Sequence, residues 1–166
     1  MEIIELKNCL DNIDENQLND FRKIIESYDD ILILGNGGSN AIAQHIAQDY
    51  TKVLNKKALC FADASRLTCY INDYGPDNAY VEFIKDFANS NSLVILISSS
   101  GKSRNIINCV NYCEKHKINI VTLSGMDLDN ELNMKGQEHG LISFHVHSYD
   151  YGVIEITHEA ILHSVC

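Results

Sequence analysis

A histidine and an aspartate stand one helical turn apart, shortly after a glycine-rich turn. The apolar residues 31–34 lead into the sequence GNGGS at 35–39, and 39–54 has the spacing of a helix. His45 and Asp49 are four positions apart, so they lie on one face of that helix. An imidazole and a carboxylate together can move protons or hold a metal ion. The glycines before them allow a ligand to approach the backbone closely.

A second turn of this kind occurs at residues 98–103, which read SSSGKS. Its hydroxyl groups and the free amides of the helix that follows would form an uncharged cradle for a phosphate group. The serines concerned are Ser98, Ser99, Ser100 and Ser103. An ordinary capped turn is the alternative interpretation, and the same alternative applies to Ser39 in the first loop.

Neither loop completes a nucleotide-binding motif. A dinucleotide fingerprint that uses Gly35 and Gly37 would need glycine where the chain has Asn40, although Asp63 resembles the ribose-binding acid of that motif. A Walker A motif ending in GKS would need glycine where the chain has Leu96. We therefore expect no nucleotide cofactor.

The C-terminal segment carries a further set of polar side chains on an otherwise apolar helix. Glu155 lies one turn from Glu159, and His163 lies eight residues after Glu155, so these side chains can border one cleft. The apolar sequence around His163 leaves a functional and a structural role equally open. We interpret three further histidines as structural: His145, His147 and His158.

Composition excludes several classes of protein. The net charge of −10 argues against a nucleic-acid partner, since such partners are bound largely through Lys and Arg. No apolar run reaches the roughly 18 residues of a membrane span, and the acidic N-terminal sequence is unlike a secretion signal. The scattered cysteines are typical of free thiols in a cytoplasmic protein, and we interpret Cys109 and Cys113 as packing residues rather than zinc ligands.

Apolar runs alternate with helical patterns along the chain. Short runs rich in branched residues predict strands at 31–34, 58–62, 93–98, 118–124 and 141–146. Helical patterns lie near 3–26, 39–54, 76–90, 103–116 and 152–166. This alternation predicts an α/β fold, a three-layer αβα sandwich around a five-stranded parallel sheet. Ligands bind at the carboxyl ends of such strands, where both loops lie.

Together these motifs resemble the sugar isomerase (SIS) domain family, and more narrowly its phosphoheptose isomerase branch. The resemblance rests on GNGGSNAIAQHIAQDY, NDYG at 72–75, ISSSGKSRNII at 97–107 and the histidines of the last helix. It implies one flavodoxin-like SIS domain over residues 1–166, with a helical segment at 1–28 and the α/β core at 29–166. Members of this branch interconvert a ketose phosphate and an aldose phosphate, usually as tetramers with sites between subunits.

The resemblance also implies roles for individual residues. It places catalysis on Asp49 and His163, and a zinc site on His45, Asp49, Glu155 and His163. The implied substrate-binding residues are Asn36, Gly37, Gly38, Ser39, Asn72, Asp73, Ser98, Ser99, Ser100, Ser103 and Glu155. The expected substrate is a small phosphorylated sugar, sedoheptulose 7-phosphate, used for lipopolysaccharide or capsule.

The chain departs from the family pattern at four positions. Asp49 replaces a glutamate, Glu155 a glutamine, Gly152 an acid and Lys102 an asparagine. These changes indicate a divergent branch and leave a second hypothesis open. In that hypothesis the domain binds a phosphosugar or a protein partner, such as a replication initiator, without catalysis. Asp49 and His163 at the reactive positions favour the enzyme.

Overall fold

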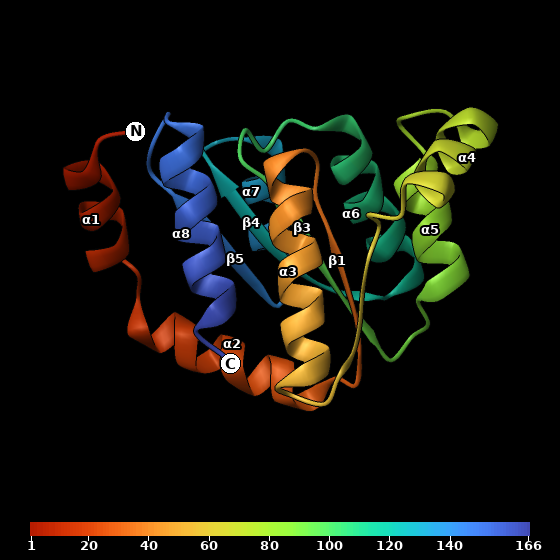
Figure 1. The fold of residues 1–166 in the computed structure, drawn as a ribbon, viewed down its shortest axis with the longest axis horizontal. Helices are drawn as coiled ribbons and strands as arrows, with labels where there is room; N and C mark the ends of the chain where they lie inside the picture. The colour runs from red at the N-terminus through yellow and green to blue at the C-terminus, as the bar shows by residue number, and fades with distance from the viewer.

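The computed structural model describes residues 1–166 and is built around a parallel five-stranded sheet in the order β2-β1-β3-β4-β5 (Figure 1). The strands are β1 (Asp30–Leu34), β2 (Lys57–Cys60), β3 (Ser92–Ser98), β4 (Asn119–Gly125) and β5 (Ile142–Val146). The predicted α/β sheet is confirmed. Because β1 lies between β2 and β3, the strand order reverses there, and the loops after β1 and β3 meet where such sheets bind ligands.

Helices cover both faces of the sheet. They are α1 (Ile3–Asp11), α2 (Glu15–Ser27), α3 (Gly38–Lys52), α4 (Ala64–Tyr74), α5 (Ala79–Phe87), α6 (Arg104–His116), α7 (Glu131–His139) and α8 (Tyr151–His163). One core joins the sheet to α2, α3 and α8, and the other joins it to α5, α6 and α7. None of the helices is both long and apolar enough to cross a membrane.

Two helices fall outside the prediction, and one predicted segment is divided. The stretch near 3–26 forms two helices, because a new helix, α2, starts after Asp14. The Asp14 side chain caps α2 by accepting a hydrogen bond from the backbone amide of Asn16. α4 was missed because its apolar face is short and only half-buried: Leu67 and Tyr70 pack against the core, but no residue of the helix is fully buried. α7 contains Gly136, which weakens the helical pattern. A Cβ at Gly136 would lie 2.0 Å from Thr122 Oγ1 on β4, so close packing on the sheet requires this glycine.

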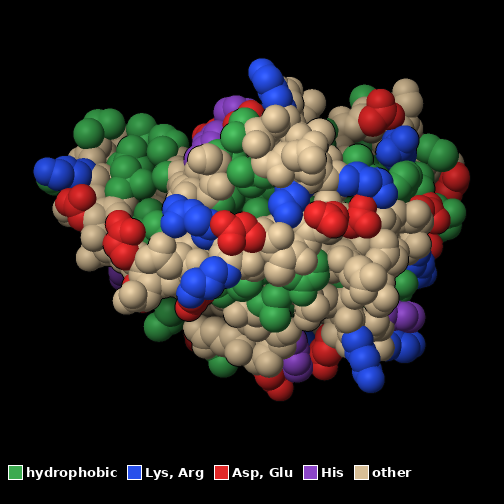
Figure 2. All heavy atoms as spheres, turned by 90° about the horizontal axis from the view of Figure 1, so that it is seen from below, with side chains coloured by type: hydrophobic (Ala, Val, Ile, Leu, Met, Phe, Trp, Pro, Cys, Tyr) green, Lys and Arg blue, Asp and Glu red, His purple; other side chains and the backbone are tan.

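The N-terminal helix α1 packs against α8 and leaves its outer side unpartnered. It buries no residue and exposes Ile3 and Ile4, and Met1 before it is exposed as well. Figure 2 shows hydrophobic side chains gathered at this end of the molecule, whereas basic and acidic groups alternate across the rest of that face. The surface around α1 is therefore less polar than its surroundings.

Candidate active site

Two parallel-running helices, α3 and α8, carry the reactive side chains and are joined by a buried hydrogen bond. The hydroxyl group of Tyr50 donates to the carbonyl oxygen of Leu162 at 2.9 Å. Burial raises the pKa of Tyr50 well above its usual value, so the hydroxyl keeps its proton. The residues next to this pair, Asp49 and His163, are thereby brought to the same level of the two helices.

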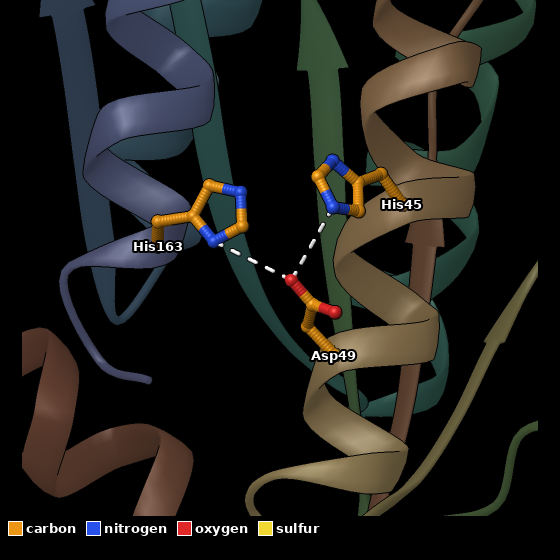
Figure 3. A group of neighbouring side chains, drawn as sticks. All are labelled: His45, Asp49 and His163. Atoms are coloured by element: carbon orange, nitrogen blue, oxygen red, sulfur yellow. Dashed lines mark ion pairs between the residues drawn. The ribbon is translucent and has the colours of Figure 1, made fainter.

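His45, Asp49 and His163 converge in the space between α3 and α8 (Figure 3). Asp49 Oδ2 lies 3.4 Å from His45 Nε2 and 3.6 Å from His163 Nδ1. The two imidazole rings meet edge to face, with centroids 5.0 Å apart. One ligand atom from each side chain lies within 4.8 Å of the others, so the group can hold a metal ion. The side chains remain partly exposed, which leaves the group open to a substrate.

A fourth side chain, Glu159, lies on the other side of the two imidazoles. Its Oε1 atom is 3.0 Å from His45 Nδ1 and 3.8 Å from His163 Nε2. The resemblance had implied Glu155 for the fourth position. α8 instead presents Glu159 to the histidines, and Glu155, one turn earlier, faces the start of α3.

A cavity of about 110 Å³ lies between the loops after β1 and β3 and the first turns of α3 and α8. Most of the residues predicted to bind substrate line it: Asn36, Ser39, Ser98, Ser99, Ser100, Ser103 and Glu155. Tyr151 is an additional wall residue. The wall includes one carboxylate and no Lys or Arg. An anion bound here would therefore be held by hydroxyl and amide groups.

The serine loop presents unused hydrogen-bonding groups to this cavity. The hydroxyl of Ser98 donates to that of Ser103 at 3.0 Å, and the buried hydroxyl of Ser99 has no partner in the chain. Ser103 precedes α6 but does not cap it with its side chain. The first amides of α6 remain available for an anion, as the sequence predicted for a phosphate cradle.

The glycine turn completes the cavity. Gly37 has φ of +54° with open space above it, a conformation that favours glycine. A Cβ at Gly38 would lie 2.3 Å from Glu155 Oε1, so the carboxylate rests directly on the Gly38 backbone. The side-chain amides of Asn36 and Asn105 exchange two hydrogen bonds of 2.9 Å, joining this turn to the start of α6.

Asn72 and Asp73 do not reach the cavity. Both are exposed near the end of α4, where Asn72 donates to Asp73 at 2.9 Å. In Figure 1, α4 packs beside α5, at the opposite end of the molecule from α8. Their assignment to substrate binding stays a prediction.

Comparison with known proteins gives this geometry its context. A family model described as "SIS domain" matches residues 11–125. The chain belongs to the SIS domain family. A phosphoheptose isomerase from Campylobacter concisus is 34% identical over 143 residues, which cover 82% of this chain and 72% of the relative. One from Buchnera aphidicola is 30% identical over 132 residues, covering 72% of this chain and 67% of the relative.

Solved structures share the fold of this SIS domain. A phosphoheptose isomerase from Neisseria gonorrhoeae superposes with a TM-score of 0.86 at 24% identity, covering 98% of this chain and 90% of that one. The Vibrio vulnificus NanR protein complexed with ManNAc-6P gives 0.70 at 16% identity, covering 98% of this chain and 58% of that one. At these identities the likeness establishes the fold.

Several residues of this SIS domain were not assigned to the site from sequence. Glu159 carried a signal, because it lies one turn from both Glu155 and His163, but spacing alone did not choose between the two glutamates. Asn105 and Tyr151 gave no signal, since their contacts depend on how the loops meet. His158 is fully buried and its Nε2 lies 3.0 Å from the Ser124 carbonyl oxygen, consistent with the structural role expected for it.

Proposed function

We propose that the protein is an intramolecular aldose–ketose isomerase that interconverts sedoheptulose 7-phosphate and D-glycero-D-manno-heptose 7-phosphate. The observation that carries the proposal is the meeting of Asp49 and His163, 3.6 Å apart, beside the helices that also border the serine cavity. The relatives named phosphoheptose isomerase, at 30% and 34% identity, support the substrate class.

The separation of the two parts of the site suits a seven-carbon sugar. Glu155 borders the cavity and His163 follows eight residues later on α8, a rise of about 12 Å. An extended chain advances roughly 1.2 Å per covalent bond, so the eight bonds from C1 of a heptose to the phosphorus of its 7-phosphate span about 10 Å. A triose phosphate, with four such bonds, would reach about half as far.

The side chains can then perform the proton transfers. Asp49 Oδ2 faces both imidazoles, whereas Oδ1 has no partner in the chain and is free to take a proton from C1 of the ketose. The electron pair of that C–H bond forms the C1–C2 double bond, and His163 protonates the O2 oxygen to give an enediol. Asp49 returns its proton to C2, His163 takes the proton from O1, and the aldehyde forms at C1.

The donor set of His45, Asp49 and His163 fits zinc, which takes nitrogen and oxygen ligands and keeps one position open in catalytic sites. We infer that these three residues hold it. When bound, zinc would polarise the sugar carbonyl and stabilise negative charge on its oxygen. Glu155, set in the cavity wall, would accept a hydrogen bond from a sugar hydroxyl near the phosphate.

Substitution of the two reacting groups tests the function. Asp49→Asn and His163→Gln should each lower turnover of sedoheptulose 7-phosphate by about 10²-fold or more. Circular dichroism would show that both variants remain folded. Full activity in either variant would overturn the assignment. Tight binding of sugar phosphates by the wild-type protein, with no turnover, would favour the non-catalytic alternative.

The protein should assemble as a homotetramer, as the family resemblance implies. The exposed apolar residues of α1 offer a surface for a second copy. Asn72 and Asp73 lie outside the cavity of their own chain, so contact with substrate would require α4 of another copy. Sedimentation of the wild-type protein, compared with an Ile3→Asp, Ile4→Asp variant, would measure the assembly. A monomeric wild-type protein would contradict it.

A further inference from the structure

The two imidazoles of the reactive cluster lie between two carboxylates rather than beside one. His45 Nε2 and His163 Nδ1 face Asp49, at 3.4 and 3.6 Å. The other nitrogen of each ring points away from Asp49 in Figure 3. Those two nitrogens face Glu159 Oε1, at 3.0 and 3.8 Å. The four side chains thus form a closed ring of contacts.

We propose that Glu159 is the positioning residue of the metal-binding cluster. This inference rests on the proposed metal-holding role of His45, Asp49 and His163. Glu159 is outside the ligand set implied by family resemblance, in which Glu155 is the fourth ligand. Glu159 acts through His45 and does not touch the metal.

The contact between Glu159 and His45 determines which ring nitrogen is free. Because a carboxylate accepts, the 3.0 Å contact with Glu159 Oε1 places the proton of a neutral His45 ring on Nδ1 when Nε2 binds the metal. The lone pair of the neutral ring is then on Nε2, the nitrogen that faces Asp49. A carboxylate that accepts from the far nitrogen of a metal-binding histidine fixes its tautomer and orientation and increases its basicity.

Glu155 is not placed to orient the His45 ring. Its carboxylate rests on the backbone of Gly38 at the start of α3, and it lines the serine cavity. Glu155 also has no hydrogen bond or ion pair to either histidine, whereas Glu159 approaches both. Of the two glutamates, Glu159 is therefore the one that can hold the imidazoles in position.

Stability does not account for the position of Glu159. Its side chain is 35% exposed and that of His45 is 51% exposed. Ion pairs as exposed as this one typically contribute less than about 1 kcal/mol. Removing Glu159 should therefore leave the fold intact while freeing the His45 ring to rotate.

Metal affinity tests the inference without reference to catalysis. Zinc would be titrated into wild-type protein and into the Glu159→Ala, Glu159→Gln and Glu114→Ala variants, in competition with a chromophoric chelator. Loss of an outer partner of a metal-binding histidine typically weakens metal binding by about 10- to 100-fold, and we expect this for Glu159→Ala. Glu159→Gln keeps a hydrogen-bond acceptor and should lose less. Glu114→Ala, the matched control, removes a carboxylate that lies 3.5 Å from a histidine outside the cluster, His139, and should bind zinc as the wild type does.

Cobalt substitution separates a positioning residue from a ligand. At saturating cobalt, the visible absorption spectrum of Glu159→Ala should match that of the wild type, because the set of ligands is unchanged. A changed spectrum would make Glu159 a ligand and overturn the inference. Wild-type zinc affinity in Glu159→Ala, an equal loss in Glu114→Ala, or no zinc binding by the wild type would also overturn it. Turnover of sedoheptulose 7-phosphate by the wild-type protein tests the proposed isomerase separately.

Discussion

Tyr50 on α3 donates a buried hydrogen bond of 2.9 Å to the carbonyl oxygen of Leu162 on α8. The Leu162 carbonyl lies in the last turn of its helix, where the usual backbone donor is missing. Both partners are next to a reacting residue in the sequence: Tyr50 directly follows Asp49, and Leu162 directly precedes His163. The hydrogen bond therefore sets the separation of the proposed acid and base.

Tyr50→Phe should weaken both the fold and the reaction. Leaving a buried carbonyl without a partner costs about 1–3 kcal/mol, which urea unfolding would measure. Loss of the link between α3 and α8 should also lower kcat for sedoheptulose 7-phosphate. Tyr112→Phe is the matched control, because the Tyr112 ring stacks on His116 and its hydroxyl makes no hydrogen bond in the chain. Equal stability of the two variants would contradict the role given to Tyr50.

Gly38→Ala should displace the Glu155 carboxylate. A Cβ at Gly38 would lie 2.3 Å from Glu155 Oε1, and the side-chain end can move more easily than the helix backbone. A hydrogen bond to a charged group contributes about 1.5–3 kcal/mol, so loss of one to the sugar should lower kcat/KM by roughly tenfold or more. The double variant with Glu155→Ala should lose little beyond either single variant. Additive losses would show that the two residues act independently.

The sheet could be predicted from sequence because its strands are buried on both faces and therefore read as continuous apolar runs. β3 was expected at 93–98 and spans Ser92–Ser98, with every residue buried. α4 was missed because its apolar stripe is short and only half-buried, with Leu67 and Tyr70 packed against the core and no residue fully buried. α7 was obscured by Gly136, a glycine required by its approach to β4.

The site was predictable where it depends on local sequence and unpredictable where two helices meet. Glycine and serine loops after parallel strands converge by topology, so the serine cavity followed from the motifs. The choice between Glu155 and Glu159 depends on how far α8 is shifted along α3. That shift is set by buried contacts such as Tyr50 with Leu162, which helical spacing does not reveal.

Lys102 should assist phosphate binding through its charge. Its Nζ atom pairs with Asp127 Oδ2 at 2.8 Å, and the Asp127 carboxylate raises the pKa of Lys102. The cavity wall contains no Lys or Arg, so Lys102 on the serine loop is a cation close to it in the sequence. Its positive charge is partly neutralised by Asp127. Lys102→Met should raise the KM for sedoheptulose 7-phosphate about two- to fivefold, the effect of a weak exposed charge, and Asp127→Asn should lower it.

Salt dependence provides a second measure of this effect. The difference in KM between wild type and Lys102→Met should shrink as ionic strength rises, because exposed charges are screened. Lys115→Met, which alters a lysine in the last turn of α6, is the control and should leave KM unchanged. If Lys102→Met and Asp127→Asn shift KM in the same direction, the pair acts as a structural bridge between loops.

Stability should fall between about pH 6.5 and pH 4 because of His158. The side chain is 0% exposed, and burial lowers its pKa from 6.5 to about 4. In this window the unfolded chain binds a proton at His158 and the folded chain does not. The contribution of neutral His158 to the free energy of unfolding is therefore fully present above the pKa that His158 has in the unfolded chain. It is lost as the pH falls toward the pKa that His158 has in the folded chain. Burial also lowers the pKa of His145, which adds a loss of the same sign.

Urea unfolding at pH 7 and at about pH 4.5 would measure this loss, which should be on the order of 2 kcal/mol for His158. Carboxylates with lowered pKa, such as Asp30, start from a usual value of 3.8 and act at lower pH. His158→Gln retains a donor for the Ser124 carbonyl but cannot titrate, so its stability should depend less on pH in this window. His116→Gln, at an exposed position, should keep the wild-type slope. Equal slopes for the wild type and His158→Gln would exclude His158 as the source.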